Sequence, residues 1–175
     1  MEINYQETTA DLLKRIDIHD KFGTKDIDQW MVQVLPLKKG MNILDIGCGA
    51  GKQCFTFYNH LGGDCAITGG DISRELLAQA KKENEKYHNA IEFIELDYNR
   101  PLQFSDNSFD LLTCCFAIYY AENIPFTLKE MHRALKPGGT LFTTGPMPDN
   151  KRLFYDVIKE ATGKQIPPMP GSSRY

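Results

Sequence analysis

The sequence has no apolar run long enough to cross a membrane. Its longest apolar stretch, from Leu111 to Ala121 with Thr113 inside it, is far short of the roughly 20 residues that a bilayer span needs. The first residues, Met1 to Glu7, have neither the basic start nor the apolar stretch of a secretory signal. We therefore expect a cytoplasmic protein that has no membrane as its partner.

The sequence also lacks paired cysteines and basic clusters. Its five cysteines form no C-x-x-C pair and their number is odd, which argues against a disulfide framework and against a zinc site. No cluster of Lys and Arg is denser than a pair, and 20 basic residues stand against 23 acidic ones, a formal net charge of -3. We therefore expect reduced thiols, no metal and no nucleic-acid partner, and a small uncharged or cationic partner fits better.

What the sequence does contain is an alternation of strand-like and helix-like segments. Its 175 residues, 42% of them hydrophobic, predict one globular domain with its own core. Short apolar runs that end in turn residues predict strands at 41–46, 65–70, 91–96, 109–116 and 140–144. Strands separated by helices in this way predict a doubly wound, mostly parallel sheet in a three-layer α-β-α domain of the α/β class.

Helices are expected between these strands because apolar residues recur there at spacings of three and four. One helix is stopped by Gly62-Gly63, and the next begins at a Ser73 cap. Another includes Leu135 and is stopped by the run 136–139, after which the fifth strand begins at Thr140. A last helix, at about 151–163, has these residues on its expected inner face: Leu153, Phe154, Val157, Ile158 and Ala161. Two amphipathic segments, around 12–16 and 27–34, precede the first strand.

A glycine-rich turn, Asp45-Ile46-Gly47-Cys48-Gly49-Ala50-Gly51, follows the first strand at the edge of the sheet where such folds bind ligands. It is not a dinucleotide fingerprint, which needs glycine where Lys52 stands. It is not a P-loop either, which needs glycine at Ile46 and Ser or Thr at Gln53. The carboxylate of Asp45 would repel a pyrophosphate and attract an ammonium. The turn therefore predicts a ligand that carries both signs of charge.

Acidic residues also end the next two expected strands. Asp71 stands where doubly wound folds place the acid that accepts hydrogen bonds from ribose hydroxyls. Asp97 can accept from an exocyclic adenine amine, with Ile72 and Tyr98 as apolar walls around the base. Together with Asp45, these acids at three successive strand ends predict one nucleoside pocket.

These residues together resemble the class I S-adenosylmethionine-dependent methyltransferases. The run 43–51 is similar to the first motif of that family, and Phe109-Asp110-Leu111-Leu112 with Cys114-Cys115-Phe116, and the run 132–141, are similar to its later motifs in the same order. The resemblance covers about 40–144 and is closest to members that act on small molecules. It implies a Rossmann-like domain at 41–163, and we expect a helical cap or lid at 1–40 and a Pro-rich tail at 164–175.

The resemblance implies that the cofactor is S-adenosylmethionine and assigns residues to its parts. The loop Gly47, Cys48 and Gly49 would lie against the methionine part, and Asp45 would favour its ammonium, directly or through water. Asp71 would hold the ribose, and Asp97 the adenine, beside Ile72 and Tyr98. Cys115 stands just past the fourth strand, where the family often contacts the cofactor. Gly70 departs from the family pattern, in which a β-branched residue is commoner.

Methyl transfer from a sulfonium is an in-line displacement with a good leaving group, so such an enzyme mainly holds two reactants in place and excludes water. No catalytic base is required, and we assign no catalytic residue. Tyr119 and Tyr120, after the central strand, are the expected substrate-binding residues. With His19 they are the nearest candidates if the acceptor must lose a proton. The segment 17–25 is expected to fold over the cofactor as a lid.

No motif identifies the methyl acceptor. The Asn-Pro-Pro-Tyr type motif, which similar enzymes use for planar amides and amino groups, is absent after the fourth strand, where Cys115-Phe116-Ala117-Ile118 stands. A small-molecule acceptor is therefore the leading hypothesis. A second class of function stays open, in which the protein binds S-adenosylmethionine or its product without turnover, as a sensor or as a subunit of a complex.

The end of the chain departs from the resembled fold, which adds two further strands after the last helix. Only the segment 164–175 remains here, and its three prolines disfavour a strand. We therefore expect five strands, and either a truncated chain or a fifth strand whose edge a second copy of the chain covers in a homodimer. The absent part is also where such enzymes often complete the acceptor site.

Overall fold

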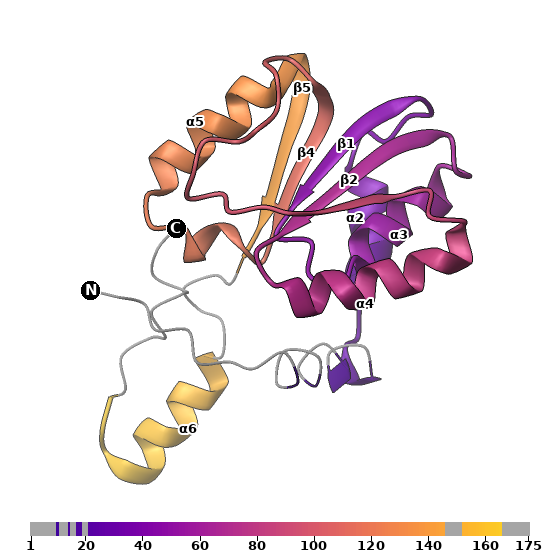
Figure 1. Cartoon of the computed structure of the whole chain (residues 1–175). Helices are drawn as coiled ribbons and strands as arrows, with labels where there is room; N and C mark the ends of the chain where they lie inside the picture. The colour runs from indigo at the N-terminus through magenta and orange to yellow at the C-terminus, as the bar shows by residue number, and fades with distance from the viewer. Residues whose placement is uncertain (1–9, 11–13, 15–16, 19–20, 146–151, 166–175) are drawn as a thin grey trace.

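A single parallel sheet organises the computed structural model, which describes residues 10, 14, 17–18, 21–145 and 152–165 (Figure 1). Within these residues the strand order is β3-β2-β1-β4-β5, and every neighbouring pair is parallel. The strands are β1 Met41–Ile46, β2 Cys65–Asp71, β3 Glu92–Glu95, β4 Phe109–Cys115 and β5 Leu135–Thr144. Because the chain reverses its direction of travel across the sheet between β1 and β4, this is the doubly wound α/β sheet that the sequence predicts.

Helices connect the strands as the apolar spacing predicts. Those of the described residues are α2 Ile27–Val34, α3 Lys52–His60, α4 Arg74–Asn84, α5 Ile124–Ala134 and α6 Arg152–Thr162, with short 3-10 turns η1 Glu85–Tyr87 and η2 Ile118–Tyr120. The expected amphipathic segment around 12–16 lies outside the described residues except for residue 14, and so does the expected tail beyond residue 165.

Side-chain caps account for where several helices begin. The Ser73 hydroxyl accepts a hydrogen bond from the backbone N–H of Leu76 at 3.3 Å, which confirms the predicted cap of α4. Asn123 caps α5 in the same way through the N–H of Phe126. Gly163, which directly follows the last residue of α6, adopts the left-handed conformation that closes many helices.

Each face of the sheet carries its own apolar cluster. Helices α2, α3 and α4 cover one face, where Phe57 is buried against Ile43 and its neighbours. Helix α5 covers the other, where Met131 is buried with Leu44 and Leu112. Figure 1 shows α5 on one side of the strands and α2, α3 and α4 on the other. We call these two sides the α3 face and the α5 face.

Strand β5 begins five residues earlier than the sequence predicts. Leu135 pairs with Phe109 of β4 instead of ending the helix, and Thr140 pairs with Leu111, so the residues between them bulge out of the ladder. The turn residues at 136–139 therefore lie inside a strand, with Gly138 at φ +79°. The predicted helix stop at this place is correct, but the predicted strand start is wrong, because a bulge lets turn residues stay within a strand.

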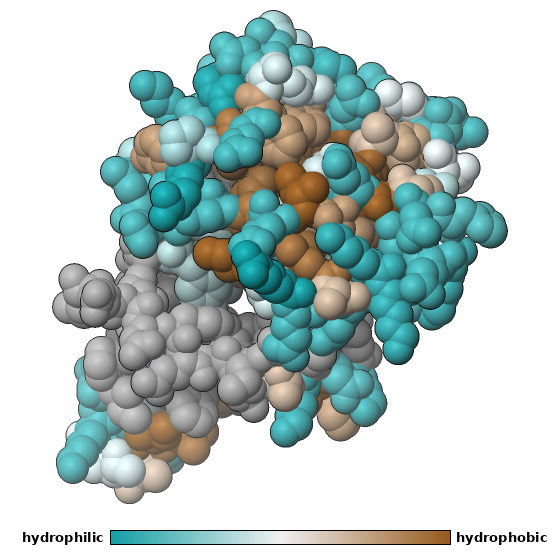
Figure 2. Space-filling view, in the orientation of Figure 1, coloured by the Kyte–Doolittle hydropathy of each residue, from teal (hydrophilic) through white to brown (hydrophobic). Residues whose placement is uncertain are grey.

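The last described elements are the least covered. Among the described residues β5 pairs only with β4, so its outer edge is open. Helix α6 leaves Leu153 and Val157 78% and 55% exposed, and Ala161 is exposed as well, so its expected inner face is wrong for these three residues. Figure 2 shows apolar side chains of α6 uncovered. The reason is that α6 follows the edge strand, and no described residue extends the sheet beneath it.

No described helix has both the length and the apolar character that a membrane span needs. In the same part of the chain, no three His, Cys, Asp or Glu side chains gather in a way that could hold a metal ion.

Candidate functional site

The glycine loop and the end of β4 meet at the point where the strand order reverses. The loop leaves β1 at Ile46 and enters α3 at Lys52, and the neighbouring strand β4 ends at Cys115. In doubly wound folds, this position beyond the carboxyl ends of the strands is where ligands bind. The candidate site is therefore built from the loop 47–51, the segment 115–120, and the acids that end β2 and β3.

Close packing and backbone conformation require glycine in this loop. Gly47 has φ +72°, and a Cβ added to it would lie 2.5 Å from the Cβ of Ala117, past the end of β4. Gly51 has φ +80°, and its added Cβ would lie 2.7 Å from the ring of Phe93 on β3. The loop is also tied down, because the N–H of Gly47 donates to the carbonyl of Gly70 at 2.7 Å. A larger residue would have to displace a neighbouring strand end as well as strain the backbone.

Asp71 links the end of β2 to this loop. One of its oxygens accepts a hydrogen bond from the N–H of Gly49 at 2.8 Å, and the other accepts from the N–H of Ser73 at 2.8 Å. The carboxylate therefore holds the loop and the start of α4 in a fixed relation. Each oxygen keeps a second lone pair, so the half-buried carboxylate can still accept from a ligand hydroxyl.

Asp45 is buried beneath the loop instead of lining its surface. Its side chain accepts hydrogen bonds from the Thr113 hydroxyl at 2.6 Å and the Cys54 thiol at 3.4 Å, and the residue is only 2% exposed. Burial raises the pKa of Asp45 to about 6, although the bonds from Thr113 and Cys54 oppose this shift. In this arrangement, both of its oxygens are engaged by side chains of the protein.

The predicted adenine residues lie after β2 and β3. The oxygens of Asp97 accept from the N–H of Asn99 at 2.9 Å and from Arg100 Nε at 3.1 Å. The hydroxyl of Tyr98 donates to the carbonyl of Ala117 at 3.1 Å, which joins the β3 loop to the β4 loop, and burial raises its pKa. Ile72 is 63% exposed, which is unusual for an isoleucine and leaves an apolar surface beside Asp71.

The two predicted site cysteines have different surroundings. Cys48 is buried in the loop, and its thiol lies against Gly69. Cys115 is half-buried, and its sulfur is 3.8 Å from the sulfur of Met31 on α2. Burial raises the pKa of Cys115 to about 11, so the thiol is neutral at pH 7. Cys115 therefore does not have the lowered pKa of a nucleophile.

The segment after β4 holds the predicted substrate residues and one that sequence reasoning missed. Tyr119 is buried, and its ring centroid lies 4.3 Å from that of Tyr120. Phe116, just before them, is 45% exposed and has φ +54°, a strained conformation for a residue with a side chain. An exposed aromatic residue held at positive φ beside the loop is a candidate contact. No sequence pattern could have indicated its backbone conformation.

Helix α2 packs against the start of α3. Asp28 forms an ion pair of 3.0 Å with Lys52, the first residue of α3, and Met31 is buried against Cys115. In the expected lid segment, Phe22 is 79% exposed, and His19 lies outside the described residues. The described residues of the segment 17–25 are therefore exposed, while α2 is held by contacts to α3 and β4.

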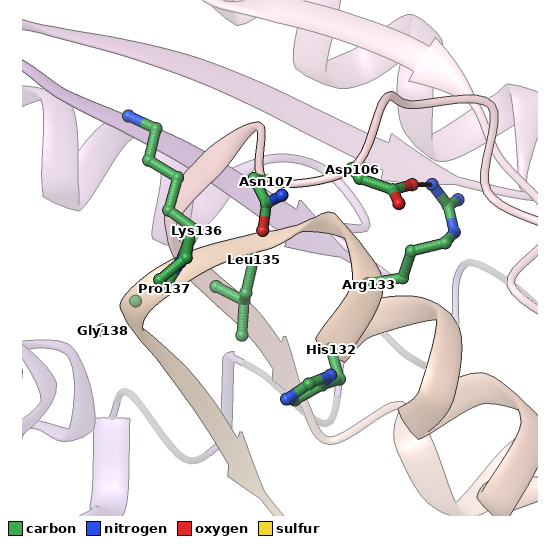
Figure 3. A pocket seen from close by; sticks show the side chains of 9 residues that line it. Asp106, Asn107, His132, Arg133, Leu135, Lys136, Pro137 and Gly138 are labelled. Carbon is green, nitrogen blue, oxygen red and sulfur yellow. Dashed lines mark hydrogen bonds and ion pairs between the residues drawn. The ribbon is translucent and has the colours of Figure 1, made fainter.

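A hollow of about 460 Å³ lies at the opposite edge of the sheet (Figure 3). It is lined by the bulge of β5 and by Arg133, which points toward Asp106 and pairs with it at 2.8 Å. Arg133 also pairs with Glu130, and Lys136 pairs with Asp110, so acids offset both cations at this place. The hollow is at the amino ends of β4 and β5, away from the loop and the strand-end acids. We therefore do not assign the functional site to it.

The comparison with known families gives one match over most of the chain. A family model described as a methyltransferase domain matches residues 37–165. This range includes all five strands, the glycine loop, and every predicted site residue from Asp45 to Tyr120.

Curated relatives carry methyltransferase names. The demethylmenaquinone methyltransferase of Staphylococcus aureus (strain MRSA252) is 35% identical over 103 residues, which are 59% of this chain and 42% of that protein. The 2-phytyl-1,4-naphtoquinone methyltransferase of Nostoc punctiforme is 36% identical over 103 residues, 58% of this chain and 44% of that protein. The chain thus spans less than half the length of these two relatives.

Solved structures give the same fold. An S-adenosylmethionine-dependent methyltransferase from Mesorhizobium loti superposes with a TM-score of 0.61 at 29% identity, over 69% of this chain and 55% of that one. A SAM-dependent methyltransferase from Aquifex aeolicus superposes with a TM-score of 0.69 over 90% of this chain and 89% of that one. Its identity is 18%, so this second likeness concerns the fold alone.

Proposed function

The chain belongs to the class I S-adenosylmethionine-dependent methyltransferases, and on that premise we propose that it transfers the methyl group of S-adenosylmethionine to a small, apolar aromatic acceptor. The observation that carries the proposal is the loop 47–51 at the reversal of strand order, held by Asp71 from the next strand. S-adenosylmethionine is the cofactor of this family, and when bound it supplies a methyl group on a positively charged sulfur.

The residues of the site fit this cofactor. At Gly49 an added Cβ would meet no atom closer than Leu76 Cδ1 at 3.9 Å, so a ligand can approach the backbone there. The carboxylate of Asp71 has lone pairs for ribose hydroxyls, and Ile72 offers an exposed apolar surface to a base. We propose that Asp97 and Tyr98 complete the adenine side. Gly47, Cys48, Gly49 and Cys115 would surround the methionine part.

The role of the protein in the reaction is mainly to orient two molecules and exclude water. Holding two reactants in a reactive pose lowers the barrier without any proton transfer, so no general base is needed. Within the described site, Asp45 is buried and accepts two hydrogen bonds, and Cys115 is neutral at pH 7. These groups set the local charge, and we propose no covalent step for either.

The segment after β4 supports an aromatic acceptor. Phe116 is 45% exposed, and Tyr119 and Tyr120 follow it along the chain in η2. Aromatic side chains suit a flat apolar molecule, because they offer large faces with few hydrogen-bonding groups. The two relatives described above are named for quinones, which are molecules of this kind. We therefore propose an aromatic ring of the quinone or hydroquinone class as the acceptor.

Two tests decide between turnover and binding alone. First, S-adenosylhomocysteine at about 100 times its Kd should stabilise the protein by roughly 2.7 kcal/mol, which raises the melting temperature by several degrees. Second, methyl-labelled S-adenosylmethionine should label reduced naphthoquinones but not peptides or RNA. A thermal shift without labelling of any acceptor favours the second candidate, a binding module. No shift contradicts both.

The proposal extends to the expected arrangement of the chain. We propose that 1–40 acts as a cap or lid over the domain at 41–163, and that 164–175 lies outside it. The free cysteines of the described residues support a reducing, cytoplasmic location. The open edge of β5 supports a homodimer, in which a second copy covers that edge. Sedimentation that stays monomeric at all concentrations would contradict the homodimer.

A further inference from the structure

One buried amide in the site has an unused hydrogen-bond donor. Gln53, the second residue of α3, is only 9% exposed, and its Nε2 has no hydrogen-bond partner among the described residues. Buried polar groups nearly always have partners, because an unpaired donor loses its hydrogen bond to water and gains nothing in return. An amide kept in this state at a candidate ligand site calls for a functional reason.

The immediate surroundings of Gln53 explain why the protein does not satisfy it. The amide lies against the thiol of Cys115 and slightly opposes the rise of the pKa of that thiol, which is a weak interaction with sulfur. That sulfur is in turn 3.8 Å from the sulfur of Met31. Thiol and thioether sulfurs are weak acceptors compared with oxygen. The sulfur of Cys115 beside the amide therefore does not accept strongly.

Gln53 lies where the start of α3 meets the end of β4, at the point where the strand order reverses. It stands two residues after Gly51, so it belongs to the helix that follows β1, whereas Cys115 ends β4. The donor therefore lies between the two loops that border the proposed methionine part of the cofactor. The N-terminal turn of a helix also favours negative charge, because its backbone N–H groups are not all paired.

The side chains on either side of Gln53 already have partners, so Gln53 supplies the side-chain donor that this turn can offer a ligand. Lys52 directs its ammonium to Asp28 on α2 at 3.0 Å. Cys54 donates its thiol to Asp45 at 3.4 Å. A negative group beneath the loop and an unused donor at the start of the helix together suit a ligand with an ammonium and a carboxylate on the same carbon atom.

We propose that Gln53 donates its Nε2–H to the carboxylate of the methionine part of S-adenosylmethionine. The ammonium of the same group is then attracted by Asp45 through the loop. This inference rests on the proposed function, because it assigns one contact of the cofactor. It also explains why a polar side chain occupies a buried position on the α3 face, since a ligand oxygen supplies the partner that the protein lacks.

The test is a comparison of two ligands in the full chain. S-adenosylhomocysteine carries the carboxylate, and S-adenosyl-3-thiopropylamine has the same atoms without it. In Gln53→Leu, isothermal titration should show about tenfold weaker binding of S-adenosylhomocysteine, as expected for the loss of one hydrogen bond to a charged group. Binding of S-adenosyl-3-thiopropylamine should change by less than about twofold. Gln53→Glu should weaken S-adenosylhomocysteine further, because two carboxylates then face each other.

A second readout separates this role from a structural one. If the donor is unused in the free protein, Gln53→Leu should leave the melting temperature of the ligand-free protein unchanged or raise it. Gln33→Leu is the matched control, because it makes the same change at an exposed position of α2 and should alter neither affinity nor stability.

Three outcomes overturn the inference. The first is an equal loss of affinity for both ligands, and the second is a clearly lower melting temperature of ligand-free Gln53→Leu, which would mean that the amide supports the fold. The third is unchanged affinity for S-adenosylhomocysteine. Failure of the unaltered protein to bind either ligand would instead contradict the proposed function, so the two failures can be told apart.

Discussion

The two faces of the sheet are built from the same strands but differ in what they bury. Toward the α5 face, β1 and β4 present Leu44 and Leu112, which pair in register and are fully buried in an apolar cluster. One residue further along, toward the α3 face, the same strands present Asp45 and Thr113, which also pair in register and are equally buried.

This difference concerns a cost in stability on the α3 face that we attribute to function. A buried carboxylate loses its hydration, and the raised pKa of Asp45 reports that loss. Its partner Cys54 lies in the first turn of α3, and so does Gln53, whose buried amide nitrogen has no hydrogen-bond partner among the described residues. We infer that the α5 face mainly stabilises the domain, whereas the end of the α3 face is arranged for a ligand. Substitutions on the α5 face should therefore mainly lower stability, whereas substitutions at the end of the α3 face should mainly change ligand affinity.

The largest effect is expected on the α5 face. Leu112→Ala should lower the free energy of unfolding by about 2–5 kcal/mol, because it removes a fully buried side chain and leaves a cavity. Urea unfolding measures this loss. The Kd of the folded protein for S-adenosylhomocysteine should stay within about twofold of its original value, and a large change in that Kd would remove the contrast between the faces.

The next effect concerns the loop between the faces. Gly47→Ala should cost about 2–4 kcal/mol of stability and abolish detectable binding of S-adenosylhomocysteine, because the new Cβ would meet Ala117 and the residue has φ +72°. Gly138→Ala is the matched control, since Gly138 has φ +79° but nothing within 4 Å of an added Cβ. The control should lose only about 1–2 kcal/mol and bind normally. Equal losses in the two variants would show that the close contact at Gly47 is unimportant.

Asp45 should make the free energy of unfolding depend on pH. Its pKa is raised from 3.8 to about 6 in the folded protein, so the folded state binds the proton more tightly than the unfolded state. The contribution of Asp45 to the free energy of unfolding is therefore fully present below pH 3.8 and is lost as the pH rises to about 6. The total loss is about 3 kcal/mol.

Asp45→Asn tests this dependence. The substitution should raise the free energy of unfolding above pH 6 and flatten its slope between pH 4 and 6, while ligand affinity falls because the ammonium loses a nearby negative charge. Urea unfolding between pH 4 and 8 measures the slope. A variant that is less stable at pH 7 than the original would contradict the view that Asp45 serves the ligand at the expense of the fold.

The smallest effect is expected at the helix cap beside Asp71. Ser73→Ala should cost about 1 kcal/mol, because the N–H of Leu76 loses its side-chain partner. The bond from the Ser73 N–H to Asp71 is made by the backbone and should remain. Thermal unfolding measures the cost, and affinity for S-adenosylhomocysteine should stay nearly unchanged. A loss of affinity above about tenfold would mean that the hydroxyl itself belongs to the site.

The sequence allowed the strands and the acids at their ends to be predicted, because apolar runs closed by Gly or Asp are local signals. Asp71 ends β2 and Asp97 follows β3, as expected. The burial of Asp45 was not predicted, since it depends on α3 closing over β1 from outside the motif. The unpaired amide of Gln53 was missed for a similar reason, because hydrogen-bond satisfaction depends on every neighbour at once.

The two errors at the end of the chain also have physical causes. Turn residues normally interrupt a strand, but a bulge opposite the step from Phe109 to Leu111 keeps residues 136–139 within β5. Spacing alone identifies an apolar helix face, but it cannot say whether a surface exists for that face to cover. In α6, Leu153 and Val157 have the right spacing and no such surface among the described residues.

Hydrogen exchange with and without S-adenosylhomocysteine tests the central claim most directly, because it reports each segment of the sheet separately. We predict that the ligand slows exchange at 47–54 and 113–117, where the loop, the start of α3 and the end of β4 meet. Exchange at 128–139, beside the hollow at the amino ends of β4 and β5, should stay unchanged. Protection at 128–139 without protection of the loop would contradict the assignment of the ligand site.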